Sequence, residues 1–106
     1  MSDRPAVRYW TAAIPGDPNH VNRFAEVNGV LFYAYPHQPY HARVGDRAVL
    51  ISLSHRSKGS WWMVNVRRCF ANGQSEWIAG EKFPEDQKDA AFVWAAQQLQ
   101  QEANDA

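Results

Sequence analysis

The sequence lacks the features that form disulfides, direct secretion or span a membrane. It contains a single cysteine, Cys69, so no disulfide can form within the chain, and we expect a reducing setting. Residues 1–5 lack the apolar core of a signal peptide. No apolar run approaches the ~20 residues that cross a bilayer. We therefore expect a cytoplasmic protein that does not associate with a membrane.

Constellations for metal binding or catalysis are missing as well. His37 and His41 have the i, i+4 spacing of zinc ligands on a helix, but Pro36 and Pro39 disfavour a helix there. Cys69 lies in a strand-like run, where a half-buried thiol is expected rather than a nucleophile. The sequence has no nucleophile elbow and no glycine-rich phosphate loop. We expect no metal, no cofactor and no enzymatic activity, and hence a protein that acts by binding.

Composition favours one domain with an unusual supply of rings. The 106 residues, 45% of them hydrophobic, fit a single domain over residues 1–106 with a packed core. Aromatic residues make up 13% and include five tryptophans, more than a domain of this size needs for packing. This surplus indicates a surface that stacks on or grips a partner.

Charge is distributed unevenly although the chain as a whole is neutral. Residues 1–70 contain nine Lys/Arg and four Asp/Glu, whereas residues 71–106 contain two and seven. Residues 47–70 contain five basic side chains and no acidic one. A local positive field of this kind attracts polyanions even when the net charge is zero.

Strands and hairpins dominate the first four fifths of the chain. Apolar alternation and β-branched residues predict strands over residues 7–14, 47–55 and 61–70. Within residues 22–35, Asn28-Gly29 predicts a type I′ hairpin, because both turn positions need a positive φ. A second hairpin is predicted at Asn72-Gly73, leading into residues 76–82, and residues 36–41 are expected to form a loop.

A helix is predicted from Pro84 to Ala103. Pro84 suits its first turn, and Glu85, Asp86 and Asp89 complement the N-terminal helix dipole. Its apolar stripe consists of Phe92, Ala95, Ala96, Leu99 and Ala103. The expected fold is α+β: an antiparallel sheet of about five strands, in the order β-β-β-β-β-α, with the C-terminal helix packed on one face.

The strand predicted over residues 61–70 has two dissimilar faces. One face is apolar and is expected to meet the helix together with two residues of the next strand; this set is Trp62, Val64, Val66 and Phe70 with Trp77 and Ala79. The opposite face is mixed and is expected to contact solvent; it carries Trp61, Met63, Asn65, Arg67 and Cys69.

Cations and an indole gather on this mixed face and on the turn that precedes it. Single-stranded nucleic acid binds such surfaces, because cations contact the phosphates and flat rings stack on the bases. The candidate nucleic-acid-binding residues are His55, Arg56, Lys58, Trp61, Asn65, Arg67 and Arg47, with Arg43, Arg23, Tyr33 and Tyr35 as extensions. The alternative is an ordinary solvated sheet surface, with Trp61 covered by the loop of residues 36–41.

Trp94 is a second candidate contact residue. On the predicted helix it lies nearly opposite the apolar stripe, among glutamines. An exposed tryptophan there indicates a contact with a protein partner or a second copy of the chain. The alternative is that the N-terminal segment, with Tyr9 and Trp10, folds over it.

A compact chain of 106 residues with one cysteine and no catalytic signature resembles the small anti-CRISPR proteins of phages and other mobile elements, especially those acting on type I CRISPR-Cas systems. The resemblance lies in size and style across the whole chain and includes no diagnostic motif, so it assigns no residue a role. It implies stoichiometric inhibition, by occupying a surveillance complex or blocking its access to DNA. Many such proteins are acidic DNA mimics, whereas the basic sheet region here favours binding the single strand displaced in an R-loop.

Two functional hypotheses remain open. The first is a non-catalytic protein that binds single-stranded DNA, with RNA as an alternative ligand, and thereby keeps a nuclease from an R-loop. The second is a protein–protein inhibitor or adaptor that docks on a Cas subunit or another cytosolic partner through Trp94 or the hairpin tips. The sequence leaves the oligomeric state open.

Overall fold

The computed structural model describes residues 6–101, which form an all-antiparallel sheet followed by a helix. The expected α+β class is confirmed, but the sheet has seven strands rather than about five. Its elements are β1 (Arg8–Ile14), β2 (Asp17–Val27), β3 (Val30–Ala34), β4 (Tyr40–Val44), β5 (Arg47–Arg56), β6 (Gly59–Cys69), β7 (Ser75–Pro84), the 3₁₀ turn η1 (Glu85–Gln87) and α1 (Lys88–Gln100). Neither helical segment within residues 6–101 has the length and apolar character needed to cross a bilayer.

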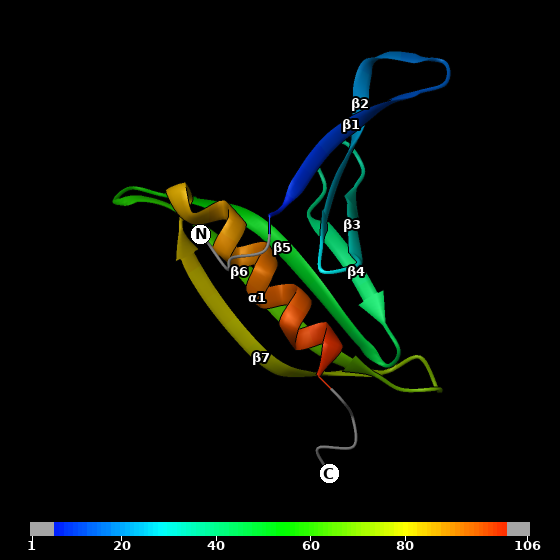
Figure 1. Cartoon of the computed structure of the whole chain (residues 1–106), viewed down its shortest axis with the longest axis vertical. Coiled ribbons are helices and arrows are strands. Elements are labelled where there is room, and N and C mark those ends of the chain that lie inside the picture. The colour runs from blue at the N-terminus through cyan, green and yellow to red at the C-terminus, as the bar shows by residue number, and fades with distance from the viewer. Residues whose placement is uncertain (1–5, 102–106) are drawn as a thin grey trace.

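The strands follow one another in a meander, so that each pairs with its neighbour in sequence from β1 to β7. Helix α1 packs on one face of this sheet and contacts β2, β4, β5, β6 and β7. Figure 1 shows α1 lying across β5, β6 and β7, while the β1–β2 hairpin extends away from the helix. We call the helix-covered side the inner face and the opposite side the outer face.

The two predicted hairpins form, and their turns differ. Asn28 and Gly29 have φ of 53° and 79°, so the type I′ turn between β2 and β3 is confirmed. Between β6 and β7, the amide of Gly73 donates to the carbonyl of Phe70 at 3.0 Å, and Gly73 has φ of 87°. This second connection is longer than a two-residue turn, because the strand ends are closed by a bond from the Phe70 amide to the Gln74 carbonyl.

The core is built around Phe92 of α1, which is fully buried. Its ring meets the rings of Phe32 and Tyr40 edge-on, with centroids 5.1 and 4.9 Å apart. The predicted helical stripe is confirmed over its described part, because Phe92, Ala95, Ala96 and Leu99 are all buried, while Ala103 lies outside the described residues. Burial of a phenylalanine side chain contributes about 2–3 kcal/mol, so this contact holds the helix on the sheet.

Helix α1 is shorter than predicted. The first turn from Pro84 is 3₁₀, and α-helical geometry begins at Lys88. At the other end Gln101 has extended backbone angles, φ −63° and ψ 131°, which end the helix at Gln100. Residues 102–103 of the predicted helix lie outside the described residues.

The expected placement of two aromatic residues on the helix-facing side is wrong. Val66 pairs with Ala79, but Arg67 pairs with Trp77, so Ile78 is an extra residue in β7. Such a β-bulge breaks the alternation, so residues on its two sides no longer share a face as their spacing of two would predict. Trp77 therefore lies on the outer face with 57% of its surface exposed, whereas Ala79 packs on the core as expected. Phe70 lies beyond the end of β6 and is 42% exposed.

The sequence prediction also missed paired segments in the first half. Residues 40–44 form β4, which partly replaces the expected loop, and β2 begins at Asp17 rather than in the region of residue 22. Both segments contain proline or histidine near their start, which conceals the alternation typical of strands. The extra strand extends the sheet from β3 to β5 and makes its outer face continuous.

Candidate nucleic-acid interface

A single row of side chains crosses the outer face from one edge of the sheet to the other. Its members face one another pairwise across all seven strands, from β1 to β7: Trp10, Phe24, Tyr33, His41, Leu50, Asn65 and Gly80. Neighbouring strands lie ~4.8 Å apart, so the row is about 29 Å long. We call this set the outer row.

Rings fill the first part of the outer row and contact one another. Trp10 and Phe24 are stacked, with centroids 5.4 Å apart and planes 12° from parallel. The rings of Tyr33 and His41 are 3.9 Å apart and bridge β3 and β4. Tyr35, 53% exposed, packs edge-on against Tyr33 at 5.6 Å. The result is two groups of contacting rings, on β1–β2 and on β3–β4, on the side of the sheet that α1 does not cover.

Trp77 adds a ring at the β7 edge, separated from the rings of β1 to β4 by Leu50 and Asn65. Gly80 has no side chain, and a Cβ at that position would lie 3.0 Å from the indole Cζ2 and 3.3 Å from Nε1. The indole therefore lies directly over the Gly80 backbone, where the side chain of any larger residue would crowd it. Its Nε1–H donates a hydrogen bond of 3.3 Å to Oδ1 of Asn65 on β6. Trp77 is thus both exposed and held in a fixed orientation.

Two arginines border the outer row on one side. Arg43 pairs with Ala48, Ala48 pairs with Arg67, and Arg67 pairs with Trp77, which forms a second row beside the first. Arg67 donates from Nε to Ser75 Oγ at 2.8 Å and from Nη2 to the Ser75 carbonyl at 3.1 Å. Arg43 donates from Nε to the Gly45 carbonyl at 2.9 Å. These bonds orient both guanidinium groups and leave other N–H groups for an anionic ligand.

Further cations border the outer row on its other side. Lys82 lies across from Met63, and its ammonium nitrogen is 4.8 Å from the ring of Trp61. Arg56 lies on the same side of β5 as Ser54, and its Nε is 3.4 Å from Ser54 Oγ. A carboxylate, Glu26, also faces outward on β2, where Arg8 binds it at 2.9 Å. Positive charge therefore borders both sides of the β4–β7 part of the outer row, whereas beside the rings of β1 and β2 Arg8 is paired with Glu26.

The structure brings five of the candidate residues to the outer face and its rim. Strand register places the following candidates there: Arg43, Arg56, Trp61, Asn65 and Arg67. Tyr33 also belongs to this face and Tyr35 lies beside it. Lys58 lies exposed in the turn between β5 and β6. His55 pairs with Ser60, so it lies on the other side of the hairpin from Trp61, and its Nδ1 is 2.8 Å from Ser60 Oγ.

Arg47 lies on the inner face, contrary to the expectation that it joins the basic patch. Only 9% of its surface is exposed, and it donates from Nη1 to the Gln98 carbonyl at 3.1 Å and to Gln101 Oε1 at 3.2 Å. These bonds satisfy acceptors at the C-terminal end of α1. Arg47 therefore links the helix to the sheet. Val49 and Ile51, which alternate with Arg47 along β5, also face inward.

Arg23 also lies on the inner side of the sheet. It donates from Nη2 to the Gln38 carbonyl at 2.7 Å, and its guanidinium lies 5.1 Å from the centre of the Tyr40 ring. Tyr40 is buried beside Phe92, so Arg23 closes one end of the core instead of extending the outer surface.

Sequence reasoning missed Trp10, Phe24 and Trp77 as members of the outer surface. The Asn28-Gly29 turn fixes the register of β2 and β3, which is enough to place Phe24 beside Tyr33. Trp10 follows once β1 is paired with β2. Trp77 could not be placed, because the bulge at Ile78 has no clear signature in the sequence.

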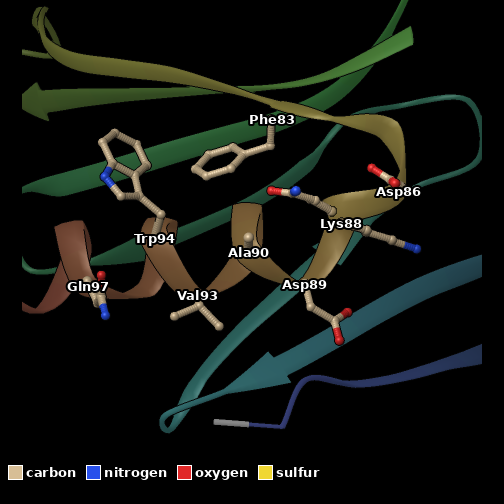
Figure 2. Close-up of a pocket in the computed structure, with 9 residues that line it drawn as sticks. Phe83, Asp86, Lys88, Asp89, Ala90, Val93, Trp94 and Gln97 are labelled. Atoms are coloured by element: carbon tan, nitrogen blue, oxygen red, sulfur yellow. The ribbon is translucent and has the colours of Figure 1, made fainter. Parts of the chain in front are cut away.

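A second feature, on the helix side, is a groove between β7 and α1. It has a volume of about 730 Å³ and is lined by Phe83, Asp86, Gln87, Lys88, Asp89, Ala90, Val93, Trp94 and Gln97. Figure 2 shows the rings of Trp94 and Phe83 beside each other between α1 and β7, and their centroids are 6.2 Å apart. Trp94 is half-buried and packs against the core beside Phe83, so the expectation of an exposed tryptophan is wrong. Tyr9 and Trp10, which the alternative placed over Trp94, pack on Phe92 and Phe24 instead.

Lys88, near this groove, sits among three rings. Its ammonium lies 4.2 Å from the centre of the Tyr9 ring, 5.3 Å from Trp62 and 5.7 Å from Tyr40. Burial lowers the pKa of Lys88, and the positive charge of Arg23 lowers it further. Burial likewise raises the pKa of Tyr9, whose hydroxyl donates to Asp89 Oδ1 at 2.5 Å. This cluster binds the start of α1 to β1 and β6.

The histidines are not gathered into a metal site. His20 contacts Asp17, with Nδ1 2.9 Å from Oδ2, and its ring is 5.3 Å from that of His37. Within residues 6–101, no three His, Cys, Asp or Glu side chains are placed to hold a metal ion together. His41 instead belongs to the outer row.

Comparisons with protein-family models, with curated proteins and with solved structures found no match to this chain. A function is therefore proposed from the geometry of this chain alone.

Proposed function

We propose that this protein binds single-stranded nucleic acid across the outer face of its sheet and catalyses no reaction. The observation that carries the proposal is the outer row: rings on the uncovered face of β1 to β4, with arginine and lysine side chains beside its β4–β7 part. Sheets that bind single strands use this combination, in which bases stack on rings and cations contact phosphates.

An unpaired strand fits this surface better than a duplex. Stacking on a side chain requires a base whose flat face is free, whereas the bases of a duplex already stack on one another. Readout of a duplex also requires a helix or a narrow ribbon that enters a groove. The outer row extends over about 29 Å, with rings on β1 to β4 and Trp77 at the β7 edge, which suits a string of unpaired bases.

The resemblance to anti-CRISPR proteins gives this activity a biological setting. In the cytoplasm of an infected cell, a protein from a phage or mobile element that covers the displaced strand of an R-loop denies that strand to the Cas nuclease. DNA is the ligand in that setting. RNA offers the same phosphates and rings, so it is the alternative ligand for the same surface.

Fluorescence anisotropy tests the proposal directly. A labelled single strand of ~30 nucleotides and the matched duplex are titrated with protein at two salt concentrations. We expect the single strand to bind more tightly, with an affinity that falls as salt rises. Absence of binding to the single strand at low salt, with folding confirmed by circular dichroism, would overturn the proposal.

Two substitutions connect binding to the outer face. Trp61→Ala and Arg67→Glu remove a ring and reverse a charge there, so both should weaken binding and any inhibition of R-loop cleavage. Arg23→Gln, on the inner face, is the matched control for the loss of a cation. If both outer-face variants bound DNA and inhibited cleavage like the wild type, the assignment of the site would be wrong.

A second candidate function is the docking of a protein partner in the groove at Trp94. The groove combines apolar rings with Asp86 and Asp89 at one end, a pattern found at protein interfaces. Salt distinguishes the two functions, because an aromatic interface is much less sensitive to ionic strength than phosphate contacts. Capture of a Cas subunit that is lost in Trp94→Ala, but kept in Arg67→Glu, would favour docking over DNA binding.

A further inference from the structure

The two edge strands of the sheet differ in how well they are protected. Strands β1 and β7 each have a single neighbour, so within the described part of the chain one long edge of each is unpaired. Natural edge strands carry charges, prolines or bulges that discourage pairing with another chain. Strand β7 has all three kinds of protection, in the charges of Glu76, Glu81 and Lys82, in Pro84 and in the bulge at Ile78.

Strand β1 has almost none of this protection. It contains one charged side chain and no proline, and five of its seven residues are exposed. The single charge, on Arg8, is paired with Glu26 of β2 at 2.9 Å. The register with β2 is regular except for a shift between Ala13 and Ile14, at the end of the strand. An extended, exposed and nearly uncharged edge of this kind is a template for pairing with another strand.

The arrangement of charge along β1 favours a second copy of the chain as that partner. A two-fold axis between antiparallel strands places the middle of each strand beside its own copy, so charges there would meet like charges. The middle residue of β1 is Thr11, and both of its neighbours are uncharged. The ends carry opposite charges, because Arg8 begins β1 and Asp17 pairs with Ile14 at its other end. Antiparallel pairing therefore brings Arg8 of each copy toward the Asp17 end of the other.

The rest of the molecule leaves room for this pairing. Helix α1 lies across β5, β6 and β7, whereas the β1–β2 hairpin extends away from the helix (Figure 1). A two-fold axis normal to the sheet keeps both inner faces on one side and both outer faces on the other. Trp10 is the end of the outer row at the β1 edge, so the row of one copy would continue into the row of the second.

We propose that β1 pairs antiparallel with β1 of a second copy of this chain, about a two-fold axis at Thr11, so that two sheets form one. Full overlap of the strands places the two Thr11 side chains opposite each other, a cross-strand pair that stabilises antiparallel sheets. The same surface is used by both copies, so the assembly closes at two chains and has β7 at both of its edges. This pairing does not rest on nucleic-acid binding, because it uses the edge of the sheet.

Molar mass measured by light scattering tests the assembly, across an ~100-fold range of protein concentration and without nucleic acid. We expect the mass to rise from one chain toward two chains and to stop there. A mass of one chain at every concentration would overturn the proposal, as would growth beyond two chains.

Hydrogen exchange at the lowest and highest concentrations locates the interface. Amides of β1 that face the open edge should exchange more slowly at high concentration, because they gain hydrogen bonds in the pair. Amides of β7 should exchange at the same rate at both concentrations. Slower exchange in β7, with none in β1, would show that the wrong edge has been assigned.

Charges introduced at Thr11 test the position of the axis. Thr11→Lys and Thr11→Glu each place two like charges opposite each other, so each variant alone should associate about threefold to tenfold more weakly. An equimolar mixture of the two variants should restore association, because opposite charges then meet across the axis. A mixture that associates as weakly as the separate variants would refute an axis at Thr11.

Ser75→Lys is the matched control, since it adds an exposed lysine to the other edge strand and should leave association unchanged. Thr11 pairs with Arg23 of β2, so a lysine at this position also adds a positive charge beside Arg23. Urea unfolding at the lowest concentration therefore checks that each variant keeps its fold as a single chain. The recovery of association in the mixture cannot come from a loss of folding.

Discussion

Arg47 and Gln98 are 51 residues apart in sequence and are joined by a hydrogen bond of 3.1 Å from the guanidinium Nη1 to the main-chain carbonyl. The carbonyl belongs to the last turn of α1, where helical partners are missing. Arg47 therefore stabilises the fold, although it belongs to a basic stretch of the sequence. Since it lies on the inner face, its loss should affect stability and leave binding at the outer face unchanged.

Arg47→Ala should lower the free energy of unfolding by about 2 kcal/mol, because the charged donor to the end of α1 and the packing of its aliphatic stem are both lost. This loss of stability is partly offset, because Arg47 Nε is buried without a hydrogen-bond partner among the described residues, and its removal relieves the cost of that burial. Urea unfolding measures the change. Oligonucleotide affinity, measured where the variant is folded, should stay within about twofold of the wild type; a loss as large as that of Arg67→Glu would place Arg47 in the site.

Trp77→Ala should weaken binding of a single strand by about tenfold, since stacking on one aromatic ring contributes ~1–3 kcal/mol per base. Stability should change little, because more than half of the Trp77 surface is already exposed. Anisotropy and urea unfolding on the same preparation check both halves of this prediction. Unchanged affinity would remove Trp77 from the interface.

Gly80→Ala tests whether the position of the indole matters. The new methyl group would lie 3.0 Å from Cζ2 of Trp77, so the indole must shift by a few tenths of an ångström. We expect binding to weaken by about threefold to tenfold in the wild-type background and to change little in the Trp77→Ala background. Equal effects in the two backgrounds would mean that Gly80 acts through the strand and not through the indole.

Salt dependence should identify the cations that meet phosphates. For single strands, each phosphate contact contributes about 0.7 to the slope of log K against log salt. Arg43→Gln and Arg67→Gln should each reduce the steepness of that slope by about this amount. Arg23→Gln should leave the slope unchanged, because its guanidinium is bound to the Gln38 carbonyl on the inner side.

Alkaline conditions should destabilise the protein partly through Tyr9. Burial and the bond to Asp89 raise the pKa of Tyr9 above its ordinary value of 10.0. Its contribution to stability is therefore fully present below pH 10.0 and is lost as the pH rises toward the raised folded-state pKa. The lowered pKa of Lys88 acts in the opposite direction, since the protein gains stability as pH rises toward 10.5.

The variant Tyr9→Phe isolates this effect. It removes the titrating hydroxyl but keeps the ring, so its stability should fall less steeply than that of the wild type above about pH 10. Urea unfolding across this pH range makes the comparison. Parallel curves for the two proteins would show that Tyr9 titrates normally in the folded state.

The sequence predicted those parts of the fold that local signals control. Asn28-Gly29 gave the first hairpin, and the spacing of Phe92, Ala95 and Leu99 gave the buried side of the helix. Strand β4 was missed, because its start follows Pro39 and its alternation spans only five residues. These failures concern the number of strands, not the class of fold.

The candidate site was predictable only in part, for a physical reason. Which face a strand residue occupies depends on register, and one extra residue reverses it. Trp61, Asn65 and Arg67 were assigned to one face correctly, because β6 is regular along their stretch. Trp77 was assigned to the wrong face, since the bulge at Ile78 forms through pairing with β6. Arg47 and Arg23 were assigned by charge, which does not reveal the direction of a side chain.

The shortest ladder in the sheet lies between β3 and β4, where Tyr33 faces His41. The aromatic contact of these two residues therefore joins β1–β3 to β4–β7 at the junction with the fewest paired residues. A polynucleotide lying along the outer row would contact both parts of the sheet and stabilise the junction between β3 and β4. Binding should then slow hydrogen exchange of the backbone amides on both sides of that junction.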